Sequence, residues 1–480
     1  MKKINIAASA FRASVSATFI AILGGCNLAP TYHRPQDVVP ATLAQTASQQ
    51  AVPLSLAATQ AHHLQWLQNA PLRQAVALAL QENRDLRIAA GNVDKARAQY
   101  GIARADQLPG INAQLQEQRS RSSADLAGGT SRVSQQITAN IGFASYEVDL
   151  WGRIRNLKAA AWQQFLQVEE NRRGVEIALI AEVTNAWLTL AADQERLTLA
   201  EQTLQSREQS YALMERMAAL GATSALALAQ NRSTVAAARG DVAQFTAQRD
   251  RSRNALQLLL GGTVPEAVLP PPGVLQTPVA LLQPLPPSLP SSVLLTRPDV
   301  QAAEHALIAQ HANIGAARAA FFPSIGLTAN VGSGSTQLDG LFTGPNRSWS
   351  FMPVIQLPIF NAGRLRFGLE AAQAAQRVAL AQYEKTVQTA FGEVLDTLAD
   401  RAQWAERLAA QHEAVSSTQT ALTLSQARFD AGMDDFLTVL DAQRSLYAAQ
   451  QTQITLRLAE QQNRITLWKV LGGQALPAAE

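Results

Sequence analysis

Phe143-Ala144-Ser145-Tyr146-Glu147-Val148-Asp149-Leu150-Trp151-Gly152-Arg153 opens a stretch of sequence, residues 143–262, that the chain contains twice. The stretch continues through long segments rich in Ala and Gln to Gly221, and it ends at Leu260-Gly261-Gly262. Adding 211 to these numbers gives the second copy, with Gly363-Arg364, Gly432 and Leu471-Gly472-Gly473. Because these glycine-marked positions keep one offset over the whole stretch, we interpret the chain as internally duplicated.

The pattern of apolar residues supports the duplication. They recur every seven positions at Val183, Leu190, Leu197, Leu204, Tyr211 and Ala218, and again at Leu408, Val415, Leu422 and Phe429. Each copy also has a front half, in which residues 83–86 match residues 297–300. We therefore expect two structural repeats, residues 72–262 and 286–473, with a proline-rich linker over residues 263–285 and a tail over residues 474–480.

The N-terminus has the pattern of a bacterial export signal. Residues 1–25 combine a basic start with an apolar stretch and small residues before Cys26, which is the only cysteine of the chain. Residues 23–26 (LGGC) are similar to a lipobox, in which the cysteine after the cleavage site carries lipid. We expect lipidation at Cys26, followed by an extended strap over residues 26–71, although an ordinary signal with a chance cysteine is the alternative.

Composition limits the classes of function. The formal charge of +3 comes entirely from Lys2, Lys3 and Arg12, which are removed with the expected signal, so no electrostatic argument for nucleic acid remains. A single cysteine excludes a disulfide within the chain. No uncharged apolar run reaches the roughly 20 residues of a membrane-spanning helix.

Four segments have the alternation of β-strands, at residues 111–116, 137–143, 325–331 and 349–359. One face of each is apolar and the other carries Gln, Asn, Ser and Thr, which is typical of a strand between lipid and a water-filled lumen. We expect two hairpins, at about 109–150 and 323–361. Four strands cannot close a barrel, since single-chain barrels begin at about eight strands, and open edges are not tolerated in lipid. Three chains would supply twelve strands; a soluble sheet is the alternative.

Long helices are expected between the strands. No proline interrupts residues 110–264 or 359–476, and the helical pattern runs from Gly152 to Gly221 and from Gly363 to Gly432. Each helix would be on the order of 100 Å long, and the seven-residue spacing predicts lengthwise packing on other helices. Returning helices complete two hairpins, over residues 152–260 and 363–472.

Six segments of the chain carry specific motifs: residues 26–35 (CNLAPTYHRP), 149–153 (DLWGR), 290–300 (PSSVLLTRPDV), 317–323 (ARAAFFP), 360–364 (FNAGR) and 432–444 (GMDDFLTVLDAQR). In this order they resemble the TolC-type outer-membrane efflux proteins, and most closely the lipoprotein branch that serves tripartite (RND) multidrug exporters. The chain departs from the family pattern at Thr296, where an arginine is usual, and in residues 66–71.

The resemblance implies a fold that is mainly α with a transmembrane β part. A homotrimer would form a twelve-stranded β-barrel in the outer membrane, continued by a long α-helical barrel through the periplasm. The implied function is a passive exit duct for drugs or other small molecules. Its partners would be a periplasmic adaptor, an inner-membrane pump and outer-membrane lipid, and it would have no cofactor beyond the covalent lipid.

The candidate site residues lie at the turns between the long helices. The family carries a gate acid at the position of Asp434, so we expect Asp434 and Asp435 to form a carboxylate ring where three chains converge, with Arg428 as a partner. Like charges brought together would raise a pKa. The alternative is that Asp434 only caps the returning helix. The first repeat has Thr223 and Ser224 at the matching position.

We also expect grooves beside Gly221, Ser224 and Gly432 to receive the adaptor, unless these glycines serve the turns alone. Bulky side chains at Ser224 or Ala225 would test this. We find no catalytic motif and no histidine pair with metal-ligand spacing, and therefore expect no enzyme. Two alternatives stay open: a structural lipoprotein that braces the envelope without a pore, and a duct for secreted proteins.

Overall fold

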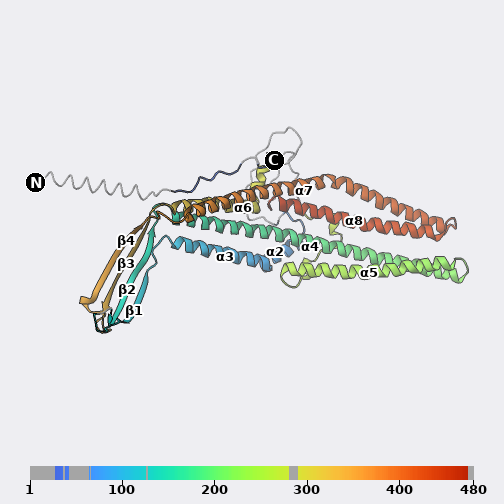
Figure 1. Cartoon of the computed structure of the whole chain (residues 1–480). Coiled ribbons are helices and arrows are strands. Elements are labelled where there is room, and N and C mark those ends of the chain that lie inside the picture. The colour runs from blue at the N-terminus through green and yellow to red at the C-terminus, as the bar shows by residue number, and fades with distance from the viewer. Residues whose placement is uncertain are drawn as a thin grey trace. The chain divides into compact units, whose positions relative to one another are not determined.

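The computed structural model of the chain describes residues 27–35, 38–42, 64, 66–125, 128–280 and 290–473. The expectations for a signal segment, for lipid on Cys26 and for the tail over residues 474–480 lie outside these residues. The first repeat contains α2 (Ala70–Glu82), α3 (Arg84–Ala105), β1 (Asn112–Arg121), β2 (Val133–Val148), α4 (Arg153–Ala219) and α5 (Ala225–Leu260). The second contains α6 (Pro298–Ala319), β3 (Ser324–Ser335), β4 (Arg347–Gln356), α7 (Arg364–Asp430) and α8 (Phe436–Val470) (Figure 1).

Two compact units make up the chain, and each takes equivalent segments from both repeats. The strand-bearing unit comprises residues 92–169 and 302–384 with the strap up to residue 36, and the helical unit comprises residues 37–91, 170–301 and 385–480. Helices α3, α4, α6 and α7 have residues in both units. Each unit therefore combines segments from both copies of the sequence.

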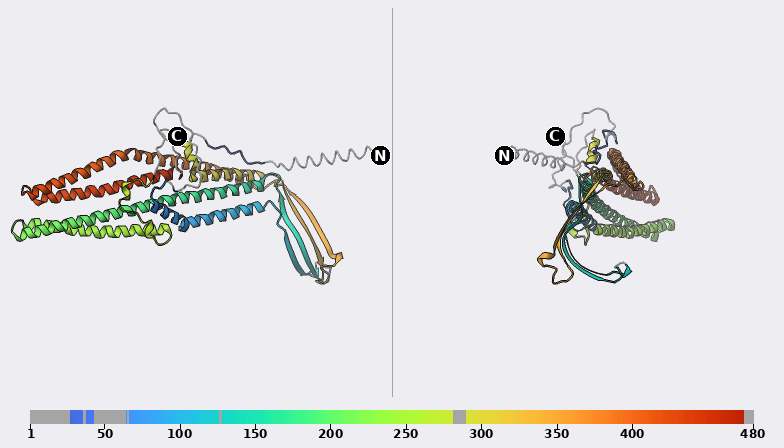
Figure 2. Two further views of the ribbon diagram at one scale, coloured as in Figure 1. Left: turned by 180° about the vertical axis from the view of Figure 1, so that it is seen from behind. Right: turned by 60° about the vertical axis from the view of Figure 1, so that its left-hand side comes forward.

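The strand-bearing unit contains one antiparallel sheet in the order β1-β2-β3-β4, with β1 (blue-green) and β4 (orange) at its edges (Figure 2). Its register separates the two faces. One row crosses all four strands as Ala113, Ile141, Val331 and Trp349, and the row beside it as Gln114, Asn140, Gly332 and Ser348. Every residue of β1 and β4 is exposed. The sheet thus has one apolar face, one polar face and two edges that no other strand among the described residues pairs.

The strands differ in extent from the alternating segments of the sequence. Strand β1 continues to Arg121 and β2 starts at Val133, because the hairpin ladder extends into polar residues. Strand β4 ends at Gln356, which lies opposite Ser324, the first residue of β3. Within β2 the register shifts between Phe143 and Tyr146, which marks a β-bulge.

Helices α4 and α7 have 67 residues each, or about 100 Å at 1.5 Å per residue. They confirm the long helical segments expected after Gly152 and Gly363. Helices α5 and α8 return with 36 and 35 residues. Helix α4 contains an 18-residue window apolar enough for a membrane span by composition, but 56% of that window is buried inside the chain. Packing against neighbouring helices accounts for this apolar stretch.

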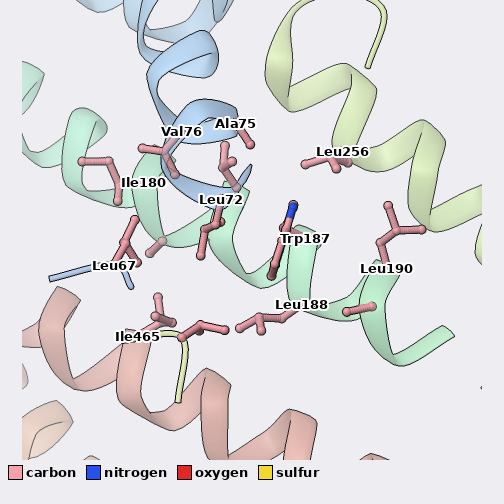
Figure 3. Packing of buried hydrophobic residues seen from close by; sticks show 14 of the residues in the cluster. Leu67, Leu72, Ala75, Val76, Ile180, Trp187, Leu188, Leu190, Leu256 and Ile465 are labelled. Atoms are coloured by element: carbon pink, nitrogen blue, oxygen red, sulfur yellow. The ribbon is translucent and has the colours of Figure 1, made fainter. Parts of the chain in front are cut away.

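A large apolar core lies within the helical unit, where α2, α4, α5 and α8 meet (Figure 3). Trp187 is fully buried there, and its indole nitrogen donates a hydrogen bond to the carbonyl of Val268 at 2.7 Å. Val268 and Leu275 belong to the short 3-10 helices η3 (Glu266–Val268) and η4 (Val274–Gln276), and both are buried. The proline-rich segment between the repeats therefore contributes to the core as well as connecting them.

The region near residue 66, where the family pattern is interrupted, packs closely. The rings of Trp66 and Trp468 stack with centroids 4.5 Å apart, and both side chains are buried. Asn69 then caps α2 by accepting a hydrogen bond from the amide of Leu72.

Candidate functional site at the helix tips

The two long hairpins turn with the same backbone geometry. The amide of Ala222 donates to the carbonyl of Met217 at 2.8 Å, and the amide of Met433 donates to that of Arg428 at 2.9 Å. Gly221 and Gly432 stand before these donors with φ of +71° and +70°. This is a Schellman motif, in which glycine takes the left-handed conformation that ends a helix. The duplication therefore extends to individual hydrogen bonds, and the turn alone accounts for both glycines.

Replacing Gly221 and Gly432 with alanine is expected to loosen both tips, since a Cβ in the left-handed region costs about 1–2 kcal/mol per residue. Hydrogen exchange of the amides in residues 214–226 and 425–437 should become faster. The control is Gly240→Ala in α5, where φ is ordinary and a Cβ would meet nothing within 4 Å. Unchanged exchange at the tips would contradict the requirement for glycine.

Asp434 forms a two-point ion pair with Arg428 of its own chain. Nε and Nη2 of Arg428 donate to the two carboxylate oxygens at 2.6 and 2.9 Å. Through this hydrogen bond, Arg428 lowers the pKa of Asp434, whereas a carboxylate ring alone would raise it. The partnership of these two residues was predicted from the sequence. The gate role itself stays a prediction.

Asp435, and not Asp434, caps the returning helix. Its Oδ1 accepts hydrogen bonds from the amides of Leu437 at 3.0 Å and Thr438 at 3.3 Å, at the first turn of α8. The alternative that Asp434 serves as the cap is therefore wrong, because its carboxylate is held by Arg428. At the equivalent position of the first repeat, Ser224 caps α5 by accepting from the amide of Ala227 at 3.1 Å. The two acids thus have different tasks, and only Asp434 presents a charge that is not used for capping.

An open groove of about 640 Å³ lies between the two tips, within the helical unit. Its lining includes Ala222, Ser224, Gly432, Asp434 and Asp435. A small apolar cluster of Met214, Phe436, Val439 and Leu440 packs beneath it. The structure therefore brings the predicted gate and adaptor residues to one groove, except that Gly221 and Arg428 stand beside it and are not among its lining residues.

Sequence reasoning missed Phe429 and Phe436, which form part of the groove. Their rings pack edge to face with centroids 5.1 Å apart, across the turn that contains Gly432. The seven-residue stripe included Phe429, but nothing in the local pattern paired it with an aromatic residue of the returning helix. This pair joins the end of α7 to the start of α8.

Two motifs of the sequence have structural tasks. Arg297 is buried in the helical unit and donates to the carbonyl of Val470 and to the carboxylates of Asp299 and Glu393. In the strand-bearing unit, the buried Glu304 accepts from Tyr32 and from two nitrogens of Arg34, all at 2.8 Å. These contacts explain why residues 32–34 and 297–299 stand out in the sequence without forming a catalytic or ligand site.

The amphipathic sheet and the long helical hairpins define the class as an outer-membrane channel protein. The chain belongs to the outer membrane efflux protein family, whose model matches residues 75–262 and 289–473. This confirms the resemblance. It also places the chain in the outer membrane as an efflux protein and not an enzyme. Among the described residues, no group of three or more His, Cys, Asp or Glu side chains is placed to bind a metal ion.

Known proteins are similar over nearly the whole chain. The probable efflux pump outer membrane protein TtgC of Pseudomonas putida is 42% identical over 94% of this chain and 93% of its own length. The structure of CusC, described as forming a transmembrane channel, has a TM-score of 0.85 and 35% identity over 94% of this chain and all of its own. The open-state outer membrane channel MtrE of Neisseria gonorrhoeae has a TM-score of 0.82 and 35% identity over 93% of this chain and 98% of its own.

Proposed function

We propose that this protein is the exit duct of a tripartite efflux system, assembled as a homotrimer. A periplasmic adaptor would connect it to an inner-membrane pump, and drugs or other small molecules would pass through it without further energy input. Lipid on Cys26, after removal of residues 1–25, would add a second attachment to the outer membrane. The repeats at residues 72–262 and 286–473 would each contribute one hairpin to the barrel and one helical hairpin to the duct.

The observation that carries the proposal is the sheet with one apolar face and two unpaired edges. Exposed backbone groups at an edge cost several kcal/mol each in lipid, so β1 and β4 require strands from other chains. Three copies supply twelve strands, within the range of known barrels. The polar face, with Gln114, Asn140 and Ser348, then lines the lumen, where small and uncharged side chains offer little selectivity among solutes.

We also propose that the groove between the tips binds the adaptor. Its apolar floor and polar rim have the character of a helix-binding groove. Ser224 and Gly432 would shape its walls, Gly221 would hold the turn beside it, and Asp434, Asp435 and Arg428 would control the aperture where three chains converge.

The test is conductance in planar lipid bilayers. Purified protein is expected to produce discrete, long-lived current steps, and a variant with Ala113→Asp, Ile141→Asp and Val331→Asp should produce none, because three acids on the apolar face oppose insertion. The matched control, Gln114→Asp, Asn140→Asp and Gly334→Asp, places the same charge on the polar face and should still conduct. Current from both variants, or from neither, would contradict the assignment of the faces.

A further inference from the structure

The apolar face of the sheet ends in arginines at its loop end. In β1, the residues that follow Leu115 on this face are Glu117, Arg119 and Arg121. In β4, the residue before Trp349 on the same face is Arg347, which lies opposite Ser333. All these side chains are exposed, and the Trp349 ring is 79% exposed. The band that meets hydrocarbon is thus followed by an aromatic residue and then by cations.

Two of the arginines keep an unneutralised charge. Arg119 pairs with Glu117 at 2.6 Å, which cancels both charges. Arg121 donates from Nε and Nη2 to the neutral hydroxyl of Ser131, at 3.3 and 3.1 Å, and forms no ion pair with any of the described acids. For Arg347, no ion pair occurs with any acid in the part of the chain that the structure describes. Arg121 and Arg347 are therefore available to an anion from outside the chain.

The strand edges bring these two arginines together in an assembly of several copies. Strands β1 and β4 have 10 residues each. At the loop side of the sheet, β1 ends with Arg121 and β4 begins with Arg347. Flush antiparallel pairing of β4 with β1 of a neighbouring copy places the two arginines side by side on the apolar face. Like charges directly opposite on neighbouring strands are destabilising unless an anion lies between them.

We propose that Arg347 and Arg121 of the neighbouring copy bind a phosphate of lipid A, with Trp349 against the sugar and acyl region below it. This inference rests on the proposed barrel of pooled strands. Guanidinium groups bind phosphate through two parallel hydrogen bonds, and Trp is favoured at the boundary between hydrocarbon and headgroups. All strand ends away from the loops lead to helices, so the arginine rim faces the outer leaflet, where lipid A carries its phosphates.

The experiment measures lipid binding to the purified full-length assembly by native mass spectrometry. The probes are bisphosphorylated lipid A, monophosphorylated lipid A and phosphatidylglycerol. The expected order of affinity follows that sequence, and binding of lipid A should weaken as salt screens the phosphates. The double variant Arg121→Gln, Arg347→Gln should weaken lipid A binding about tenfold or more, since it removes both charged donors of the proposed phosphate contact.

Two controls keep the result specific. Arg366→Gln removes another exposed arginine, beyond β4 at the start of α7, where it pairs with Glu370, and should leave lipid A binding unchanged. The double lysine variant, Arg121→Lys and Arg347→Lys, keeps the charges but not the two parallel hydrogen bonds, and its affinity for lipid A should lie between those of the wild type and the double glutamine variant.

Equal lipid A affinity in wild type and the double glutamine variant would overturn the proposal, as would phosphatidylglycerol binding as tightly as lipid A. Conductance is recorded on the same samples. If the protein conducts but its affinity for lipid A does not depend on the two arginines, only this inference is refuted. If the protein never conducts, the proposed function is refuted.

Discussion

Replacing Asp434 with alanine is expected to raise single-channel conductance several-fold and to reduce selectivity for cations. The substitution removes the carboxylate that holds Arg428 at the tip, and it leaves an arginine where an ion pair stood. One exposed ion pair stabilises little by itself, but it is repeated in every copy around one aperture. The measurement is current through single channels in planar bilayers with unequal salt on the two sides.

A charge-matched control is available one turn away. Asp430 lines the same groove, but among the described residues its carboxylate accepts from Gln426 and from no arginine, so Asp430→Ala should leave conductance near the wild-type value. The exchange Arg428→Asp, Asp434→Arg retains a pair within each chain and reverses the charge of the proposed ring. This double variant is expected to have the low conductance of the wild type, with its selectivity between cations and anions reversed. If Asp434→Ala conducts and selects as the wild type does, the gate assignment is wrong.

The pH dependence of the gate follows from the direction of the pKa shift. Arg428 lowers the pKa of Asp434, so the ion pair is complete above the ordinary aspartate pKa of about 3.9 and is lost as pH falls through the lowered value. Conductance of the wild type should therefore not rise through this group between pH 8 and 5. An increase in that range that depends on Asp434 would indicate a raised pKa, as expected for a carboxylate ring without the arginine.

Placing tryptophan at Ala222 is expected to abolish efflux in cells. Ala222 is exposed and lines the groove between the tips, so an indole there would occupy the space proposed for the adaptor. Drug susceptibility of cells and crosslinking to the adaptor are the measurements, and both efflux and crosslinking should be lost. The sequence suggested Ser224 as a position for a bulky side chain. Its hydroxyl caps α5, however, so replacing it would also weaken the helix and confuse the result.

The control for this prediction is Ala225→Trp. The sequence suggested Ala225 as a position for testing the adaptor site, but the structure does not place it among the residues that line the groove, although it is exposed in the first turn of α5. It should therefore leave efflux intact. Normal efflux with Ala222→Trp, in protein that still reaches the outer membrane, would show that the adaptor binds elsewhere.

The fold could be predicted from the sequence because its determinants are periodic. The duplication and the long helices between Gly152 and Gly221, and between Gly363 and Gly432, depend on repeats of spacing that one chain displays by itself. The alternation of apolar and polar residues likewise identified the two faces of the strands. The exact ends of β1 and β4 could not be predicted, because the ladders continue into polar residues that lack the alternating pattern.

The site could be predicted only in part. The partnership of Arg428 with Asp434 follows from their positions around Gly432, but the choice of cap depends on backbone angles at residues 434 and 435. Asp435 has the extended backbone of a cap, with φ of −80° and ψ of 163°. The contact of Phe429 with Phe436 depends on the angle between α7 and α8, which no local pattern encodes.

The most direct test of pooled strands is the mass of the detergent-solubilised protein, measured by light scattering without heating and after heating. The account predicts three times the mass of one chain before heating and the mass of one chain afterwards, with lipid attached to Cys26. A protein that is monomeric before heating, or that stays soluble without detergent, would contradict the shared barrel and with it the exit duct.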